Sequence, residues 1–288
     1  SNLGIILRDL GQTEEAEVAL RKAISLNPKE IEYLSILGTI LYDLGNLKES
    51  EDVLRKAIKI KPSFAEAHNN LSHTLLKAKH FTEGWTEYEW RWEAKRKGSI
   101  GVKLQTTKPM WNPSMKGKVF IWPEQGIGDQ LLFLTLIPDL IDKVDKLILK
   151  IDKRLIPLLK RSFDNQIILM SKEEELDENA YDYHLPLGSL PKFFRQTLIS
   201  FKHSPKLHLI VDQKRSNSFR KELLNNTQKK IIGISWRTTT KNYQKNSIPL
   251  EEIICSIYSP HIIFVNLQYG DVKEEINNIK LKYNIDIY

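Results

Sequence analysis

The sequence has very little cysteine and no long apolar run, and each absence excludes a class of protein. With one cysteine, Cys255, the chain cannot form an internal disulfide or a cysteine-based zinc site. Its apolar neighbours Ile254 and Ile257 predict that Cys255 lies on a buried helix face. The longest apolar run, Leu131–Ile137, is far shorter than the about 18 residues of a membrane-spanning helix. The first residues also lack a charged-then-apolar signal pattern.

Several catalytic motifs are absent as well. None of the 7 histidines belongs to an HExxH motif or lies close to a paired carboxylate, so we expect no metal and no other cofactor. No GxSxG motif of a serine hydrolase occurs, and no phosphate-binding P-loop. Metal-dependent hydrolysis and serine-based hydrolysis are therefore not expected.

The charge of the chain is moderately basic and evenly spread. Lysine and arginine number 43 against 36 acidic residues, which gives a net charge of +7 over 288 residues. The densest basic run, Lys95–Lys97, follows a predicted helix, where cations are favoured by the helix dipole. We therefore expect no nucleic-acid partner, whereas an acidic or phosphorylated small ligand fits this charge. The length favours two domains or one large one.

The first third of the sequence repeats with a step of 34 residues. Small residues recur where two helices must approach closely, large residues recur between them, and a proline ends each unit. The positions in register are Gly4, Gly38 and Ser72; Leu3, Leu37 and Leu71; Leu7, Leu41 and Leu75; Ala16, Ser50 and Gly84; Leu20, Leu54 and Tyr88; Ala23 and Ala57; Pro28 and Pro62. This pattern resembles the tetratricopeptide repeat (TPR), and it predicts an α-helical TPR solenoid over residues 1–97.

The third unit departs from the pattern. Arg91 stands where the first two units have alanine. An aromatic stripe at helical spacing follows the turn of the unit and consists of Phe81, Trp85, Tyr88 and Trp92. We expect this stripe to cap the solenoid and dock it on the next domain, with a ligand platform as the alternative reading. Trp90 lies off the stripe, and we expect it to be exposed.

Beyond residue 97 the pattern changes from helical repeats to alternating strands and helices. Residues 98–117 are predicted as a linker because of their glycines and prolines. The expected strands are 118–122, 146–151, 167–170, 183–188, 230–236 and 262–268, and the expected helices are 129–142, 155–163, 250–258 and 272–282. This alternation predicts Rossmann-like α/β domains with parallel sheets, one over residues 118–228 and an incomplete second one over 229–288.

Two loops that follow strands carry the candidate site residues, because ligands bind beyond the carboxyl ends of parallel strands. In the first loop, Gly126 and Gly128 would let a ligand approach a helix N-terminus, with Gln125 beside them. Asp129 is the candidate general base, and the alternative is a helix N-cap. Glu124 is a second carboxylate, and the alternative for it is a hydrogen bond that fixes the loop.

The second loop is rich in hydroxyl groups and cations, which bind diphosphates by charge-assisted hydrogen bonds. Its candidate phosphate-binding residues are Arg237, Thr238, Thr239, Lys241 and Lys245. The alternative is a solvated loop in which Ser247 caps the helix that begins near Pro249.

These motifs together resemble the bacterial TPR glycosyltransferases related to heptosyltransferases, the family 9 glycosyltransferases. The stretches that carry the resemblance are Glu124–Asp129, Leu131–Pro138, Ile232–Trp236, Ser247–Leu250 and Val265–Gln268. The resemblance implies a GT-B fold, in which two Rossmann-like domains face a cleft. It also implies metal-independent, inverting transfer from a nucleotide sugar, with Asp129 as the base and the second loop on the donor phosphates.

The resemblance also implies what surrounds this activity. The acceptor would be a glycan or a protein hydroxyl, as in repeat-bearing O-linked N-acetylglucosamine transferases, and the TPR groove would bind a protein partner. We expect a cytoplasmic protein, at most peripheral to the inner membrane. The family's later donor-site segment would follow Tyr288, and the first repeat begins within a helix, so we expect a fragment that is inactive as it stands. A non-catalytic TPR scaffold that mediates protein–protein interaction is the alternative function.

Overall fold

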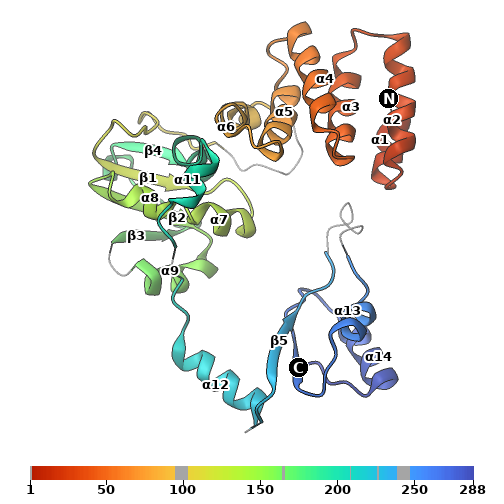
Figure 1. Cartoon of the computed structure of the whole chain (residues 1–288). Coiled ribbons are helices and arrows are strands. Elements are labelled where there is room, and N and C mark those ends of the chain that lie inside the picture. Colours follow the sequence, from red (N-terminus) through yellow and green to blue (C-terminus); the bar gives the residue numbers. More distant parts are fainter. Residues whose placement is uncertain (1, 95–102, 164–165, 208, 226, 239–246) are drawn as a thin grey trace. The chain divides into compact units, whose positions relative to one another are not determined.

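The computed structural model forms two compact units, residues 1–210 and residues 211–288 (Figure 1). The structure describes residues 2–94, 103–163, 166–207, 209–225, 227–238 and 247–288. The first unit contains both the helical repeats and a four-stranded sheet, and the second contains a two-stranded sheet. Within the described residues, none of the helices is long and apolar enough to cross a membrane.

The repeats form antiparallel helix pairs, as their 34-residue pattern predicts. The helices are α1 (Asn2–Asp9), α2 (Thr13–Leu26), α3 (Ile31–Asp43), α4 (Leu47–Ile60), α5 (Ala65–Lys77) and α6 (Phe81–Tyr88), followed by the short 3-10 helix η1 (Glu89–Trp92). A Cβ placed on Gly38 would lie 2.5 Å from Cγ of Leu54, so the small residue is required for the contact between α3 and α4. Ser50 Oγ donates to the Gly38 carbonyl at 2.7 Å across the same contact.

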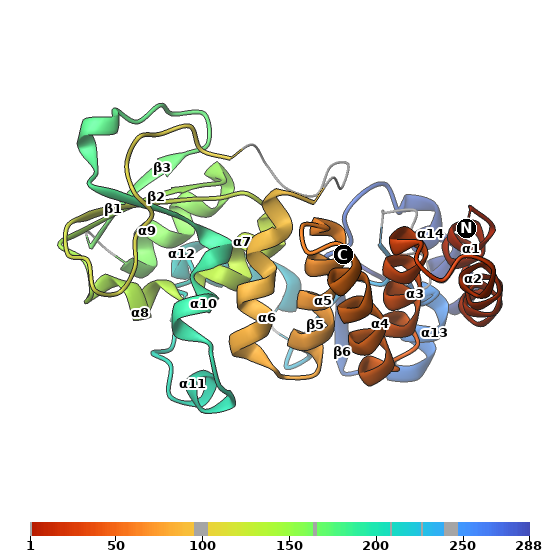
Figure 2. The ribbon, with the colours of Figure 1, turned by 90° about the horizontal axis from the view of Figure 1, so that it is seen from above.

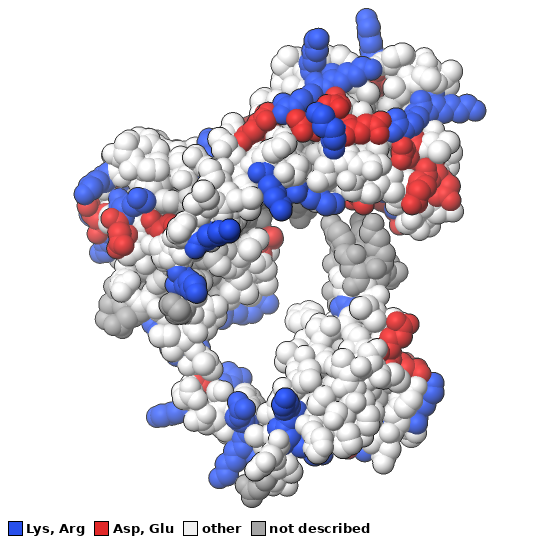
Figure 3. All heavy atoms as spheres, in the orientation of Figure 1, with Lys and Arg blue, Asp and Glu red and all other residues white. Residues whose placement is uncertain are grey.

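Ion pairs also recur with the repeat, and charged side chains of both signs lie side by side on these helices (Figure 3). Arg21 on α2 pairs with Glu17 on its own helix and with Glu49 on α4. Thirty-four residues later, Arg55 on α4 makes the same two kinds of pair, with Glu51 and with Glu83 on α6. The hydrogen bond from Arg55 holds the pKa of the Glu83 carboxyl below its usual value. We call this series the ion-pair ladder.

The first sheet is fully parallel, with strand order β3-β2-β1-β4. Its strands are β1 (Lys118–Trp122), β2 (Lys146–Ile151), β3 (Ile167–Ser171) and β4 (Tyr183–Pro186). Val119 of β1 pairs with Leu147 of β2 on one side and with Tyr183 of β4 on the other. The chain leaves β1 toward β2 and later returns to the opposite side of β1, so the order reverses between β1 and β4. Ligands of open α/β sheets bind at such a point.

Helices and loops cover this sheet, and two of them differ from the expectation. The helix expected over residues 129–142 is in fact two helices, α7 (Ile127–Leu134) and α8 (Ile137–Ile141). Pro138 lies in the first turn of α8, because proline has no backbone N–H to bond the preceding turn and fits only at the start of a helix. The segment expected as a linker joins the α/β core from residue 103 on: Trp111 is buried, and its backbone N–H donates to the His184 carbonyl at 2.9 Å. The remaining elements are η2 (Lys153–Leu155), α9 (Ile156–Phe163), η3 (Glu178–Ala180), η4 (Leu187–Ser189), α10 (Pro191–Phe194) and α11 (Leu198–Lys202).

The second unit begins with a helix that the alternation of strands and helices does not predict. Its elements are α12 (Gln213–Leu224), β5 (Lys230–Ile234), α13 (Leu250–Ile257), β6 (Ile262–Asn266) and α14 (Lys273–Tyr283). Strands β5 and β6 are parallel, and Ile287 makes a further parallel bridge with Phe264 of β6. Helix α13 buries Ile254, but the next residue, Cys255, is exposed, so the expected buried position of the cysteine is wrong. Successive helical side chains lie about 100° apart, which turns Cys255 away from the core.

Candidate functional site

The loop after β1 lies at the reversal point of the first sheet, next to the loop after β4. The backbone N–H of Gly188 in η4 donates to Glu124 Oε1 at 3.1 Å, which joins the two loops. A Cβ on Gly188 would lie 2.3 Å from the same oxygen, so the approach requires glycine. The two loops therefore meet directly outside the carboxyl ends of β1 and β4.

Glu124 has a structural role in this loop. Its carboxylate pairs with Arg91 of η1 at 3.0 Å, and both side chains are only 1% exposed. Burial raises the pKa of the Glu124 carboxyl, and the Arg91 guanidinium and the Gly188 N–H oppose that rise. The carboxylate is thus closed off from any ligand, in agreement with the reading of Glu124 as a residue that fixes the loop.

Asp129 lies in the opposite environment, although it is only five residues away. It occupies the first turn of α7, where Gly126 is the N-cap, so the N-cap reading of Asp129 is wrong. Its side chain is exposed, and no described residue forms a hydrogen bond or an ion pair with its carboxylate. The structure therefore places an accessible carboxylate just beyond β1.

The glycines before Asp129 leave space in front of the helix. Neither Gly126 nor Gly128 has a positive φ, so the turn itself does not require glycine. A Cβ on Gly128 would meet no atom within 4 Å, so packing does not require it either. Gln125 donates its side-chain amide to the Tyr88 hydroxyl of the repeat region. The loop is therefore held at Gln125 and open at Gly128.

The aromatic stripe docks the solenoid on this domain, as predicted. Trp85 Nε1 donates to the Arg195 carbonyl at 2.8 Å, the rings of Phe81 and Phe201 lie 4.8 Å apart, and those of Trp92 and Trp122 lie 5.4 Å apart. Helix α6 lies alongside α10 at this junction (Figure 2). The stripe is consequently packing and not a free ligand platform.

Trp90 was expected to be exposed and is instead half-buried. Its ring stacks on the His68 imidazole at 4.1 Å with an interplanar angle of 10°. His68 in turn bonds Glu87 through Nδ1 and the Pro62 carbonyl through Nε2. Trp90 therefore belongs to the packing of the third repeat.

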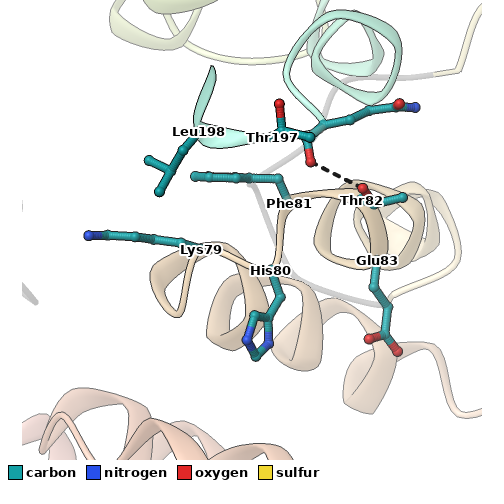
Figure 4. A pocket seen from close by; sticks show the side chains of 8 residues that line it. Lys79, His80, Phe81, Thr82, Glu83, Thr197 and Leu198 are labelled. Carbon is teal, nitrogen blue, oxygen red and sulfur yellow. Dashed lines mark hydrogen bonds between the residues drawn. The ribbon is translucent and has the colours of Figure 1, made fainter. Parts of the chain in front are cut away.

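The rim of the junction is open (Figure 4). A cavity of about 430 Å³ lies between the α5–α6 turn and the start of α11. Thr82 Oγ1 donates to the Gln196 carbonyl at 3.1 Å at its edge, and the Phe81 side chain extends toward Leu198. Tyr88 and Arg91 are buried within the junction, whereas this cavity lies at its outer edge.

The candidate donor loop of the second unit is described only in part. Thr239, Lys241 and Lys245 lie outside the described residues. Arg237 is already paired: its Nε lies 2.9 Å from Glu275 Oε1, and its Nη2 donates to the Asp271 carbonyl at 3.0 Å. The guanidinium is thus tied to the first turn of α14 and the loop before it.

The backbone of this loop is held by Gln268, which follows β6. Gln268 Oε1 accepts hydrogen bonds from the backbone N–H groups of Trp236 and Arg237, both at 2.9 Å, and from Ser235 Oγ at 3.1 Å. The N–H of Thr238 donates to Ser247 Oγ at 3.2 Å, so Ser247 closes the loop and does not cap α13, whose N-cap is Pro249. Three backbone donors are therefore satisfied within the chain.

A cavity of about 450 Å³ lies beside this loop. It is lined by Ser235, Trp236, Arg237, Thr238, Ile248 and Ile253. Any phosphate bound here would be recognised by side chains at the cavity wall, because the backbone donors are engaged. Among the described residues, no group of three or more His, Cys, Asp or Glu side chains is placed to hold a metal ion.

Sequence reasoning missed the residues that hold both loops. Arg91 was visible as a break in the repeat pattern, and Gln268 as the last residue of the strand expected over 262–268, which in the structure ends at Asn266. Gln130 is the third: its Nε2 donates to the Gln125 carbonyl and its Oε1 accepts from the Asp152 N–H, both at 2.9 Å. Glu124, Asp152 and Trp236 lie 22 to 33 residues from these partners, so no local pattern indicates those contacts.

Comparison with known proteins confirms the repeats. Residues 1–30 match the sequence profile described as tetratricopeptide repeat, and residues 38–78 match one described as TPR repeat. Protein FlbA of Caulobacter vibrioides is 26% identical over 237 residues, which cover 74% of this chain and 39% of FlbA. The chain thus spans well under half the length of this relative.

Solved structures are similar over parts of the chain. The first TPR domain of Spaghetti (RPAP3), bound to an HSP90 peptide, has a TM-score of 0.31 and 16% identity over 32% of this chain and 73% of its own. MamA has a TM-score of 0.31 and 23% identity over 33% and 55%. A mutant O-GlcNAc transferase of Thermobaculum terrenum has a TM-score of 0.31 and 13% identity over 59% and 40%. TM-scores this low do not establish a common fold over the whole chain.

Proposed function

We propose that this protein is a glycosyltransferase of GT-B type, with Asp129 as the general base. The hydroxyl of a glycan or protein acceptor would give its proton to the Asp129 carboxylate. The acceptor oxygen would then form a bond to the anomeric carbon of a nucleotide sugar. The bond from that carbon to the phosphate oxygen breaks, the nucleoside diphosphate leaves with the electron pair, and the configuration at the carbon is inverted.

The environment of Asp129 is the main support for this proposal. It is an exposed carboxylate without a partner among the described residues, in the first turn of the helix that follows a central strand. A general base must be able to reach its substrate, and the exposure of Asp129 leaves its carboxylate accessible from solvent. The open space in front of Gly128 would let the acceptor approach.

The donor phosphates would be bound in the second unit, without a metal ion or other cofactor. Arg237 and Thr238 line the cavity beside β5, and Thr239, Lys241 and Lys245 would complete the set. Arg237 would then share its charge between Glu275 and the diphosphate. The repeats would present the acceptor or a protein partner, and heptosyl transfer and protein O-glycosylation are the two forms of this activity.

Exchange of Asp129 for asparagine tests the proposal directly. Asp129→Asn should lower kcat at least about 100-fold, because a general base contributes about 10² to 10⁴ in rate. Donor binding, measured as the thermal shift with the nucleotide sugar, should stay unchanged. Asp142→Asn is the matched control, because Asp142 is exposed as well and lies outside this loop. Equal activity of Asp129→Asn and wild type would refute the base assignment.

The donor is identified first, with a thermal-shift screen of nucleotide sugars and nucleoside diphosphates. A shift with one nucleotide class would support the transferase.

A non-catalytic TPR scaffold is the second candidate function. The pairing of Arg237 with Glu275 and the satisfied backbone donors of Trp236 and Arg237 favour it. A folded protein that responds to no nucleotide would support this scaffold.

A further inference from the structure

We propose that Arg91, which belongs to the repeat region, is the positioning residue for the loop that carries Asp129. The reaction in which Asp129 takes part rests on the proposed function. The physical link between Arg91 and the loop stands on the contacts alone.

Arg91 enters the reversal point of the sheet. Its side chain is 1% exposed, and it donates from Nη2 to Glu124 Oε1 at 3.0 Å and to Ser189 Oγ at 2.8 Å. Glu124 follows β1 and Ser189 follows β4. A guanidinium from the repeats therefore bridges the two loops between which ligands of such sheets usually bind.

Both terminal nitrogens of the Arg91 guanidinium are engaged, while its buried Nε has no hydrogen-bond partner among the described residues. Its Nη1 donates to Glu89 Oε1 at 2.7 Å and to the Tyr88 carbonyl at 3.2 Å. Its Cζ lies 4.6 Å from the centre of the Tyr88 ring and 4.7 Å from that of Trp92. A lysine has no planar group to lie between two rings and no fork of donors for two loops. The cation is therefore held from several sides at once.

Hydrogen bonds on both sides of Asp129 connect it to this contact. Gln125, the next residue, bonds the Tyr88 hydroxyl of the same repeat segment. The Gln125 carbonyl accepts from Gln130, which in turn accepts from the backbone N–H of Asp152 after β2. Asp129 thus lies between two fixed points, one on the repeats and one on the loop after β2. Loss of the first point would free the start of α7.

Hydrogen exchange measured by mass spectrometry tests the proposal without any substrate. In Arg91→Met, amides of residues 123–134 and 186–190 should exchange at least about tenfold faster than in wild type, because hydrogen bonds of charged groups are lost. Helices α3 and α4 should be unchanged. Arg55→Met is the matched control, since it removes an arginine with two carboxylate partners from the surface. Unchanged exchange in both loops of a folded Arg91→Met would overturn the proposal.

A second variant keeps the test valid if Arg91→Met does not fold. Arg91→Met combined with Glu124→Gln leaves no unpaired buried charge, and the same two loops should still exchange faster. Normal protection of the loops in this double variant would equally refute the role of Arg91.

Kinetics separate positioning from stability. Arg91→Lys should lower kcat for sugar transfer and leave the KM for the donor unchanged, because the donor loop lies in another unit. A raised donor KM with an unchanged kcat would contradict positioning of Asp129. If wild type transfers no sugar from any donor, the proposed function fails, but the exchange experiment still decides whether Arg91 holds the loop.

Discussion

At the scale of the residue, Glu124 and Asp129 show how differently two carboxylates of one loop can be placed. Glu124 is buried against an arginine that precedes it by 33 residues, whereas Asp129 is exposed on a helix. The sequence suggests both as site residues, because both follow a strand. It cannot separate them, since the partner of Glu124 comes from the repeats and becomes visible only when the two regions are packed together.

This environment makes the stability of an Arg91 variant depend on pH. Burial raises the pKa of Glu124 in the folded state, and Arg91 opposes that rise, so Arg91→Met raises the pKa further. A carboxyl with a folded pKa above its unfolded value of about 4.3 stabilises the fold below that value. The contribution is lost as the pH rises through the folded pKa. Arg91→Met should therefore be much less stable at pH 8 than at pH 5. At pH 8 its free energy of unfolding should lie about 3–5 kcal/mol below that of wild type, because a buried charge is left unpaired.

Urea unfolding at the two pH values measures this difference. Wild type should show a smaller change, because Arg91 compensates the charge. Glu124→Gln in the Arg91→Met background should remove the extra pH dependence, since an amide does not titrate. A pH-independent loss of stability in Arg91→Met would indicate that Glu124 is not the titrating group.

At the scale of the element, the local patterns in the sequence predict most of the fold. The limits of β1 and β2 agree with the structure, and the 34-residue step places the repeat helices. Helix α12 is missed because its 12 residues show no apolar face, although Asp212 caps it by accepting from the Arg215 N–H at 3.0 Å. The spacing of apolar residues cannot indicate a helix such as α12, which buries none of its side chains.

The approach of two elements gives a prediction with an internal control. Gly188→Ala in η4 would force a Cβ to 2.3 Å from Glu124 Oε1, so it should destabilise the protein by about 1–3 kcal/mol. Gly128→Ala in α7 meets no atom within 4 Å and should be stabilising by about 0.5–1 kcal/mol, because alanine favours a helix. Thermal unfolding compares the two. A Gly128→Ala protein that is stable but no longer transfers sugar would further support an acceptor in front of α7.

At the scale of the whole molecule, the repeats and the first sheet form one compact unit, residues 1–210. The sequence predicts that the aromatic stripe docks on the next domain, and the structure confirms it. The sequence does not predict that residues 103–117 join the α/β core, because glycine and proline indicate turns whether or not a segment is buried. The cleft of a GT-B fold is a matter of how two units are placed, and it stays a prediction.

The shared junction predicts cooperative unfolding of this unit. With Trp85, Tyr88 and Trp92 packed against the α/β domain, opening of α6 should require opening of the sheet. Native-state hydrogen exchange at increasing urea should show that amides of α6 and β1 lose protection at the same concentration. Loss of protection in α6 at clearly lower urea than in β1 would show that the repeats open on their own.

The end of the ion-pair ladder has a consequence for protein engineering. Arg21 and Arg55 are followed at the next 34-residue step by Glu89, which accepts from Arg91 and from Ser189 of the α/β domain. The contacts with the α/β domain described above thus come from the last unit, while the earlier units contact mainly their neighbours in the stack. A consensus unit of 34 residues inserted at the turn between α4 and α5 would lengthen the array and leave the attachment intact. The reach of the solenoid and its anchoring can therefore be varied independently.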